Sequence, residues 1–201
     1  FGREVRLFSE IRKLGHHVTI LCADQVKKER TTSELNGMRV EIYPFGLLDF
    51  LKFKAAAKKM AQESDIVVGT THPLLGYVAL AAAKEARKKV VYDLRDNYEA
   101  YDFSNMPMLK RGLLPKLVNN HIIKNCDLAV CVSNSLRHKI AVVRKRPTVF
   151  IPNGVEPIFR PLNKTVCRKK LNLPAKAPII IYTGHISKER GTDTLIAAFK
   201  I

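Results

Sequence analysis

Charged side chains follow one of the apolar runs of this sequence, where they could act on a substrate. Asp93, Arg95 and Asp96 come at the end of or directly after the run at 89–94. A carboxylate here could orient an acceptor hydroxyl or balance a developing cation, and the guanidinium could hold a phosphate. The structural alternative is a local Asp–Arg pair that caps the following segment. We predict that these three residues are catalytic.

Two further polar residues follow expected strands. His72 comes shortly after the apolar run at 65–69, and Ser133 ends the run at 127–133. We expect both on the acceptor side of a site. The alternatives are a structural role for His72 in its loop and a helix-capping role for Ser133.

Glycines and cations are paired at two places that could bind a diphosphate. Gly2 and Arg3 precede an expected helix at 1–14. A second loop, at 184–191, opens a helix that starts at 192. Glycine allows a close approach of the backbone, and a cation at a helix N-terminus favours an anion. The alternatives are a simple turn glycine and loop cations in solvent. The predicted donor-binding residues are Gly2, Arg3, Gly184, His185, Arg190 and Gly191.

The elements that must position these residues alternate between strand and helix. Several strands are continuous apolar runs, which is typical of a parallel sheet covered on both faces. In such sheets ligands bind beyond the carboxyl ends of the strands. The predicted fold is α/β, a Rossmann-like parallel sheet with helices on both faces, followed by an incomplete second Rossmann-like lobe. Expected strands are 17–23, 38–45, 65–69, 89–94, 127–133, 148–151 and 178–183; expected helices are 1–14, 47–62, 74–87, 109–124, 166–171 and one from 192.

Turn residues divide the chain. Pro152, Asn153 and Gly154 are followed by further prolines, which predicts a linker at 152–161. Residues 1–151 are expected to form one α/β lobe, and residues 162–201 the incomplete start of a second.

The charge of the chain is high and uneven. Formal net charge is +17, and nine Lys or Arg against one acid lie between 107 and 146. Such a field attracts nucleotide diphosphates, anionic membranes or nucleic acid, although a solvated basic face is the simpler explanation. The helix at 47–62 mixes Phe50 and Phe53 with four lysines, which favours either docking on an anionic membrane or packing on the sheet. The four cysteines lack metal-site or disulfide spacing, so a reducing cytoplasm is expected. The basic charge adds the expectation of peripheral attachment to the inner face of the cell membrane.

Five segments in order resemble the family-4 glycosyltransferases of the GT-B fold, over nearly the whole chain. They are Gly2-Arg3-Glu4 with Gly15-His16-His17-Val18-Thr19, Asp93-Leu94-Arg95-Asp96, Val132-Ser133, Ile151-Pro152-Asn153-Gly154-Val155 with Phe159, and Tyr182-Thr183-Gly184 through Arg190-Gly191-Thr192-Asp193-Thr194-Leu195. Three positions depart from the family pattern: His185 replaces a common arginine, Arg190 replaces the usual lysine, and Asp93 stands where many relatives have histidine.

The resemblance implies transfer of a sugar from a nucleoside-diphosphate sugar to an acceptor hydroxyl, with retention of anomeric configuration. It implies neither cofactor nor metal, because the Asp-x-Asp metal motif of the other large glycosyltransferase fold is not present at 93–96. The expected partners are the nucleotide sugar, a saccharide or lipid-linked acceptor of cell-envelope polysaccharide, glycolipid or glycoprotein assembly, and an anionic membrane. The resemblance also implies that 1–151 is the acceptor lobe, with its first strand missing, and that 162–201 is the truncated start of the donor lobe. The fragment alone is expected to be inactive.

Three alternatives remain open from the residues alone. A basic nucleic-acid-binding or membrane-docking module without catalysis would explain the charge, but the cations are mostly not interleaved with aromatic residues and no nucleic-acid-binding motif occurs, so no nucleic-acid partner is expected. A nucleotide-sugar epimerase or dehydrogenase would need a G-x-G-x-x-G turn after a strand, and this sequence has no such motif. The third alternative is a catalytically dead remnant.

Overall fold

The structure is a computed structural model that describes residues 2–24, 26–44, 46–70, 72–97 and 113–199. The chain divides into two compact units, Phe1–Gly154 and Val155–Ile201, and the division falls inside the predicted 152–161 linker. Each unit is described by itself.

The first unit contains two sheets, and both are built around parallel pairs. The smaller sheet has the order β1-β3-β2, in which β1 and β3 are parallel and β2 is antiparallel to β3. The larger has the order β4-β5-β6-β7, all parallel. The strands are β1 (Thr19–Asp24), β2 (Thr31–Leu35), β3 (Met38–Pro44), β4 (Ile66–Thr70), β5 (Lys89–Leu94), β6 (Leu128–Cys131) and β7 (Thr148–Phe150).

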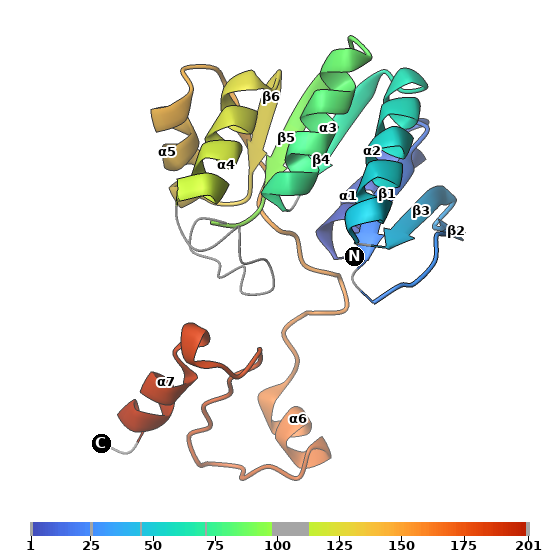
Figure 1. Cartoon of the computed structure of the whole chain (residues 1–201). Coiled ribbons are helices and arrows are strands. Elements are labelled where there is room, and N and C mark those ends of the chain that lie inside the picture. The colour runs from blue at the N-terminus through green and yellow to red at the C-terminus, as the bar shows by residue number, and fades with distance from the viewer. Residues whose placement is uncertain (1, 25, 45, 71, 98–112, 200–201) are drawn as a thin grey trace. The chain divides into compact units, whose positions relative to one another are not determined.

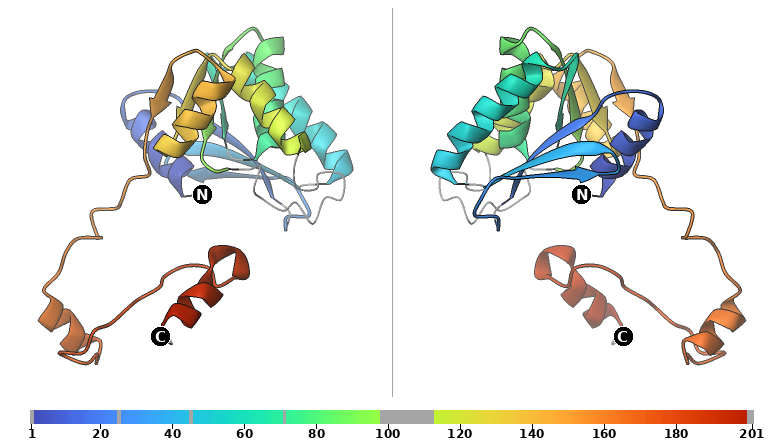
Figure 2. Two further views of the ribbon diagram at one scale, coloured as in Figure 1. Left: turned by 90° about the vertical axis from the view of Figure 1, so that its left-hand side faces the viewer. Right: turned by 90° about the vertical axis from the view of Figure 1, so that its right-hand side faces the viewer.

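Helices cover both faces of these sheets, which confirms the predicted α/β class. In two views, α2, α3 and α4 lie on one face and α1 on the other (Figures 1 and 2). The helices of this unit are α1 (Arg3–Lys13), α2 (Leu47–Gln62), α3 (Pro73–Glu85), α4 (Leu113–Asn125) and α5 (Asn134–Val143). The predicted ranges for these elements were correct to within a few residues. The start of the expected helix at 109–124 lies partly outside the described residues.

The main core lies between β5, β6 and the helices α3 to α5. Tyr92 and Ile122 are fully buried there, and the Tyr92 hydroxyl donates a hydrogen bond of 2.8 Å to the Asn119 side chain. Gly76 of α3 lies directly against this pair: a Cβ at Gly76 would meet the Tyr92 ring at 2.8 Å and Ile122 at 3.2 Å. The absence of a side chain at Gly76 therefore allows α3 to pack closely on the sheet.

The β2–β3 hairpin was not among the predicted elements. Its turn is Asn36-Gly37, and both residues have positive φ, 51° and 74°. This is the backbone of the two-residue turn that Asn-Gly favours between antiparallel strands. The Asn-Gly turn signal was present in the sequence. The strand β2 before this turn was missed because residues 31–35 are mostly polar.

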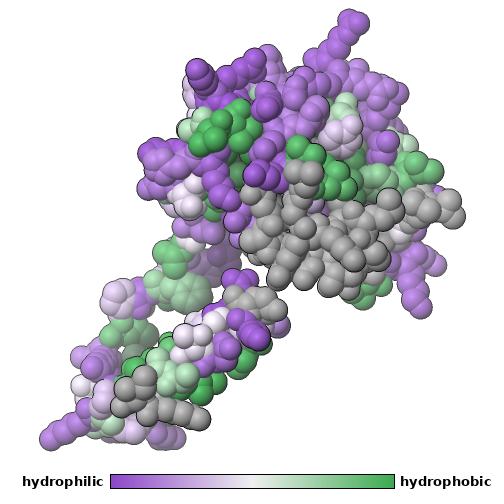
Figure 3. Space-filling model, turned by 60° about the vertical axis from the view of Figure 1, so that its left-hand side comes forward, coloured by the Kyte–Doolittle hydropathy of each residue, from purple (hydrophilic) through white to green (hydrophobic). Residues whose placement is uncertain are grey.

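The second unit has little regular structure. It contains α6 (Lys164–Lys170), the 3₁₀ turn η3 (Lys188–Arg190) and α7 (Thr192–Ala198). The predicted strand at 178–183 is wrong: the structure has no strand there, and Ile180 and Ile181 are 69% and 72% exposed. A strand needs a neighbour for its backbone groups, and no described segment supplies one. Apolar side chains are accordingly visible on the surface of this unit (Figure 3).

The contact of Gly76 with the core predicts the effect of a single methyl group. We expect Gly76→Ala to lower the free energy of unfolding by about 1–3 kcal/mol, because the added Cβ overlaps the Tyr92 ring. Urea unfolding followed by circular dichroism measures the change. Gly154→Ala is the control, since nothing lies within 4 Å of a Cβ at that glycine. Equal stability of the two variants would contradict this account of the packing.

Candidate functional site

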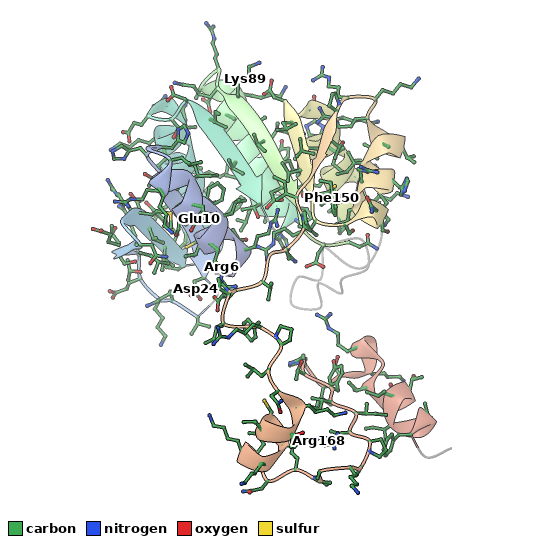
Figure 4. The ribbon with its side chains drawn as sticks, turned by 180° about the vertical axis from the view of Figure 1, so that it is seen from behind. Arg6, Glu10, Asp24, Lys89, Phe150 and Arg168 are labelled. Carbon is green, nitrogen blue, oxygen red and sulfur yellow. The ribbon has the colours of Figure 1, made fainter. Side chains whose placement is uncertain are left out.

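An ion pair between Arg3 and Asp93 lies at the carboxyl edge of the larger sheet. Arg3 Nε lies 3.1 Å from Asp93 Oδ2, and Arg3 Nη2 lies 3.5 Å from Oδ1. The two side chains are 9% and 7% exposed. Figure 4 shows the two ends of the parallel strands. Lys89 begins β5 at the amino edge of the sheet, and Phe150 ends β7 at the opposite, carboxyl edge. Arg3 therefore joins the N-terminus of α1 to the end of β5.

The same guanidinium also holds the chain that leaves β7. Arg3 Nη1 donates to the carbonyl oxygen of Pro152 at 3.0 Å and to Asn153 Oδ1 at 3.2 Å. All three guanidinium nitrogens thus have protein acceptors. Arg3 was predicted to bind the donor; in the structure its guanidinium joins the start of α1 to Asp93 and to the turn at 152–153.

A second ion pair runs beside the first. Arg95 Nη1 contacts Glu4 Oε1, and the two side chains are 26% and 14% exposed. Thr70, at the end of β4, lies 3.4 Å from the same Glu4 oxygen. The local Asp93–Arg95 pair considered from the sequence is not formed; instead, each of the two residues pairs with α1. Because α1 presents Arg3 and Glu4 in succession, it supplies one charge to each partner.

The other predicted residues of this edge are less confined. Asp96 is exposed and follows the buried end of β5. Gly2 precedes α1, is exposed, and has open space where a side chain would be. Its φ of −84° is ordinary for any residue, so the structure gives no backbone reason for glycine here.

His72 and Ser133 begin helices. His72 Nδ1 accepts a hydrogen bond of 3.2 Å from the backbone N–H of Leu74 at the start of α3. Ser133 Oγ accepts one of 3.2 Å from Leu136 at the start of α5, as the capping alternative predicted. Burial lowers the pKa of His72 from its usual value of 6.5, which favours the neutral ring that this cap requires. In the structure each residue therefore caps the start of a helix.

The predicted donor-binding residues of the second unit belong to one loop. A Cβ at Gly184 would meet the Tyr182 hydroxyl oxygen at 2.9 Å, and that hydroxyl donates to the carbonyl oxygen of His185 at 2.9 Å. Gly191 has φ 68°, a left-handed conformation that glycine adopts without strain. Arg190 is exposed at the end of η3. Gly184 thus leaves room for the Tyr182 side chain, Gly191 allows the left-handed backbone, and the Arg190 side chain is exposed to solvent.

Two members of the edge cluster were missed by sequence reasoning. Glu4 appeared only as part of a motif, and Asn153 only as a turn residue and part of another motif. Their partners are distant in sequence: Arg3 and Asn153 are separated by 150 positions. The one available signal for Glu4 was its position, as an acidic residue in the first turn of the first helix.

Among the described residues, no three His, Cys, Asp or Glu side chains are grouped so that they could hold a metal ion. Within the same residues, no helix is long and apolar enough to cross a membrane.

The Arg3–Asp93 pair predicts strong coupling between two distant residues. Arg3→Met should lower the free energy of unfolding by about 3 kcal/mol, because it leaves a nearly buried carboxylate without its cation. Asp93→Asn should cost less than Arg3→Met, because Arg3 keeps Pro152 and Asn153 as acceptors. The double variant should lose less than the sum of the single losses, as measured by urea unfolding in a double-mutant cycle.

The exposed pair Lys13–Glu10 provides a matched control. Its side chains are both 68% exposed, so the cycle of Lys13→Met and Glu10→Gln should give a coupling below about 0.5 kcal/mol. Similar coupling energies for the two pairs would show that the Arg3–Asp93 contact does not stabilise the fold.

The family model described as Glycosyltransferase Family 4 matches residues 5–158, which include Asp93, Arg95, Ser133 and the turn at Asn153. No curated protein sequence matches the chain. The match covers most of the chain and nearly all of its first unit, and it agrees with the α/β architecture described above. The chain belongs to glycosyltransferase family 4.

Proposed function

We propose that the protein transfers a sugar from a nucleoside-diphosphate sugar to an acceptor hydroxyl. The observation that supports this most is the convergence of Arg3, Glu4, Asp93 and Arg95 at the carboxyl edge of a parallel sheet, in a chain of the glycosyltransferase family. Ligands of open α/β sheets bind beyond this edge. Arg3 and Glu4 come from α1, and each forms an ion pair with a residue at the end of β5. These ion pairs fix the positions of the four side chains before a ligand binds.

In the proposed reaction, Asp93 and Arg95 act on the acceptor side. Asp93 orients the acceptor hydroxyl or balances positive charge that develops on the sugar, and Arg3 holds this carboxylate in place. Arg95 is partly exposed and could exchange Glu4 for a phosphate of the acceptor. Arg3 is therefore a positioning residue in this proposal.

The donor diphosphate is assigned to the loop at 184–191. Transfer develops negative charge on the leaving diphosphate, and a cation aimed at that charge lowers the barrier. Arg190 is exposed, and its guanidinium can bind two phosphate oxygens at once. Gly184, His185 and Gly191 shape the loop around it. Retention of configuration, independence from metal, the GT-B arrangement and a role in cell-envelope assembly are further parts of the proposal that the family resemblance suggests.

The assignment of Arg190 predicts a large loss of turnover. In the full-length protein, we expect Arg190→Ala to lower kcat by about a hundredfold, because one diphosphate contact is lost. Release of UDP or GDP from UDP-glucose, UDP-N-acetylglucosamine and GDP-mannose would be measured with and without EDTA. EDTA should leave the wild-type rate unchanged.

Lys176→Ala is the control for this experiment, because Lys176 is an exposed cation of the same unit. It should retain nearly full activity. A rate for Arg190→Ala within twofold of wild type would remove Arg190 from the donor site, and a wild-type rate abolished by EDTA would show that the reaction needs metal.

We also propose that the first unit docks on anionic membrane through charge alone. The structure corrects the expected role of the aromatic residues of α2: Phe53 is 5% exposed and packs edge-on against Tyr43, and Phe50 packs against the same cluster. Arg144 is likewise withdrawn from the basic surface, because it is buried. Lys54 and Lys59 of α2 remain exposed.

This proposal predicts binding that salt removes completely. Flotation with vesicles of phosphatidylcholine, with and without phosphatidylserine, should show binding only to the anionic vesicles, lost as the Debye length falls from about 10 Å to about 3 Å. Changing Lys52, Lys54, Lys58 and Lys59 to Gln should weaken it, whereas Lys27→Gln with Lys28→Gln is the control away from α2. Equal binding to both vesicles, or none, would contradict membrane docking.

A further inference from the structure

Arg3 and Arg95 lie at the carboxyl edge of the larger sheet, and they differ in how many of their guanidinium nitrogens are used. All three nitrogens of Arg3 donate to protein acceptors. Arg95 contacts Glu4 through Nη1, and among the described residues its Nε and Nη2 have no acceptor. These two nitrogens form one side of the guanidinium fork, which matches two oxygens of a phosphate. Arg95 is therefore able to bind a further anion.

Exposure distinguishes the two ion pairs in the same way. The Arg95 and Glu4 side chains are 26% and 14% exposed, more than those of the Arg3–Asp93 pair. Gly2, Glu4 and Arg95 also line a cavity of about 480 Å³, and nothing lies within 4 Å of a Cβ at Gly2. A ligand that reaches this edge therefore has room beside the Glu4–Arg95 pair.

Glu4 can leave Arg95 without losing every contact. The oxygen that contacts Arg95, Glu4 Oε1, also lies 3.4 Å from the Thr70 hydroxyl at the end of β4. Because that hydroxyl donates to Glu4, it can hold the carboxylate after the guanidinium has turned to another anion. Asp93 differs, since both of its carboxylate oxygens lie against Arg3, and separation of that pair would leave two poorly solvated charges.

We propose that Arg95 binds a phosphate group of the acceptor, and that Glu4 occupies this anion site until the phosphate displaces it. That the phosphate belongs to the acceptor rests on the proposed function; the anion site itself does not. Glu4 then sets the charge that an acceptor must carry. A phosphate monoester brings about two negative charges and three oxygens to Arg95, whereas a carboxylate brings no more charge than Glu4 already supplies.

The neighbouring Asp93 limits the class of acceptor. Asp93 and Arg95 are separated by one residue, so their Cα atoms are at most about 7 Å apart. Their partners, Arg3 and Glu4, are consecutive in α1, so the two charged groups lie side by side. A single molecule can therefore place a hydroxyl at Asp93 and a phosphate at Arg95. The acceptor class is a sugar or polyol phosphate, either free or at the head of a lipid.

NMR titration of this chain measures the anion site without turnover, and the Nε–Hε signal of Arg95 reports the contact directly. The probes are methyl glucoside 6-phosphate, its octyl analogue, and methyl glucuronide, which has a carboxylate in place of the phosphate. We expect the glucuronide to bind at least about tenfold more weakly than the methyl phosphate. Tighter binding of the octyl probe than of the methyl probe assigns a lipid-linked acceptor, and equal binding assigns a free one.

The variants separate the roles of Glu4 and Arg95. Glu4→Gln should bind the methyl phosphate at least about fivefold more tightly than wild type, because the competing charge is gone. Arg95→Gln should lose the binding, and Arg95→Lys should weaken it, since lysine keeps the charge but lacks the fork. Glu85→Gln is the matched control: it removes the same charge from the exposed Lys58–Glu85 pair, so it should bind as wild type does.

Circular dichroism verifies that each variant is folded. Equal affinity of wild type and Glu4→Gln, binding that survives in Arg95→Gln, or a glucuronide bound as tightly as the phosphate would overturn the proposal. Absence of phosphate binding to Glu4→Gln would do the same. If the phosphate binds as expected but the full-length protein releases no UDP or GDP, the anion site stands and the proposed function fails.

Discussion

The site depends on the way a single guanidinium joins three parts of the first unit. Arg3 belongs to α1, Asp93 to the end of β5, and Pro152 and Asn153 to the segment after β7. With only 9% and 7% of the two side chains exposed, water competes weakly for the pair, and loss of either charge leaves the other poorly solvated. The position of Asp93 relative to the chain that leaves the sheet is therefore set by α1. Glu4 and Arg95 form a second pair with the charges reversed, one residue further along α1 and two residues beyond Asp93.

Local patterns were sufficient to predict most of the fold of the first unit. The apolar run that forms β5 is buried at Val90, Tyr92 and Leu94, and such runs alternate with helices as parallel sheets require. The polar strand β2 lacked this pattern and was missed, although its Asn36-Gly37 turn was visible in the sequence. Regular structure that rests on hydrogen bonds to a neighbour, rather than on burial, is harder to predict from one segment.

The candidate site was predictable by position but not by partner. Asp93 and Arg95 were expected at the end of a strand, and they are found there. Their adjacency suggested a local pair, yet Asp93 binds a residue 90 positions away. Residues two apart in an extended chain lie on the same face, but that rule could not identify which charges of α1 would meet Asp93 and Arg95. Arg144 shows the same limit: it was counted with the surface cations, but it is buried and donates to the carbonyl oxygens of Ile123, Cys126 and Asp127.

Strands need neighbours as well as suitable sequence, and this constraint explains two features of the chain together. The segment 178–183 has the composition of a buried strand but no described strand beside it, and it stays irregular with Ile180 and Ile181 exposed. Within the described part of the chain, β1 and β4 each have one neighbouring strand and keep their strand geometry, and both line the same cavity. A segment with one paired edge thus keeps its strand geometry here, whereas a segment without a paired edge does not form a strand.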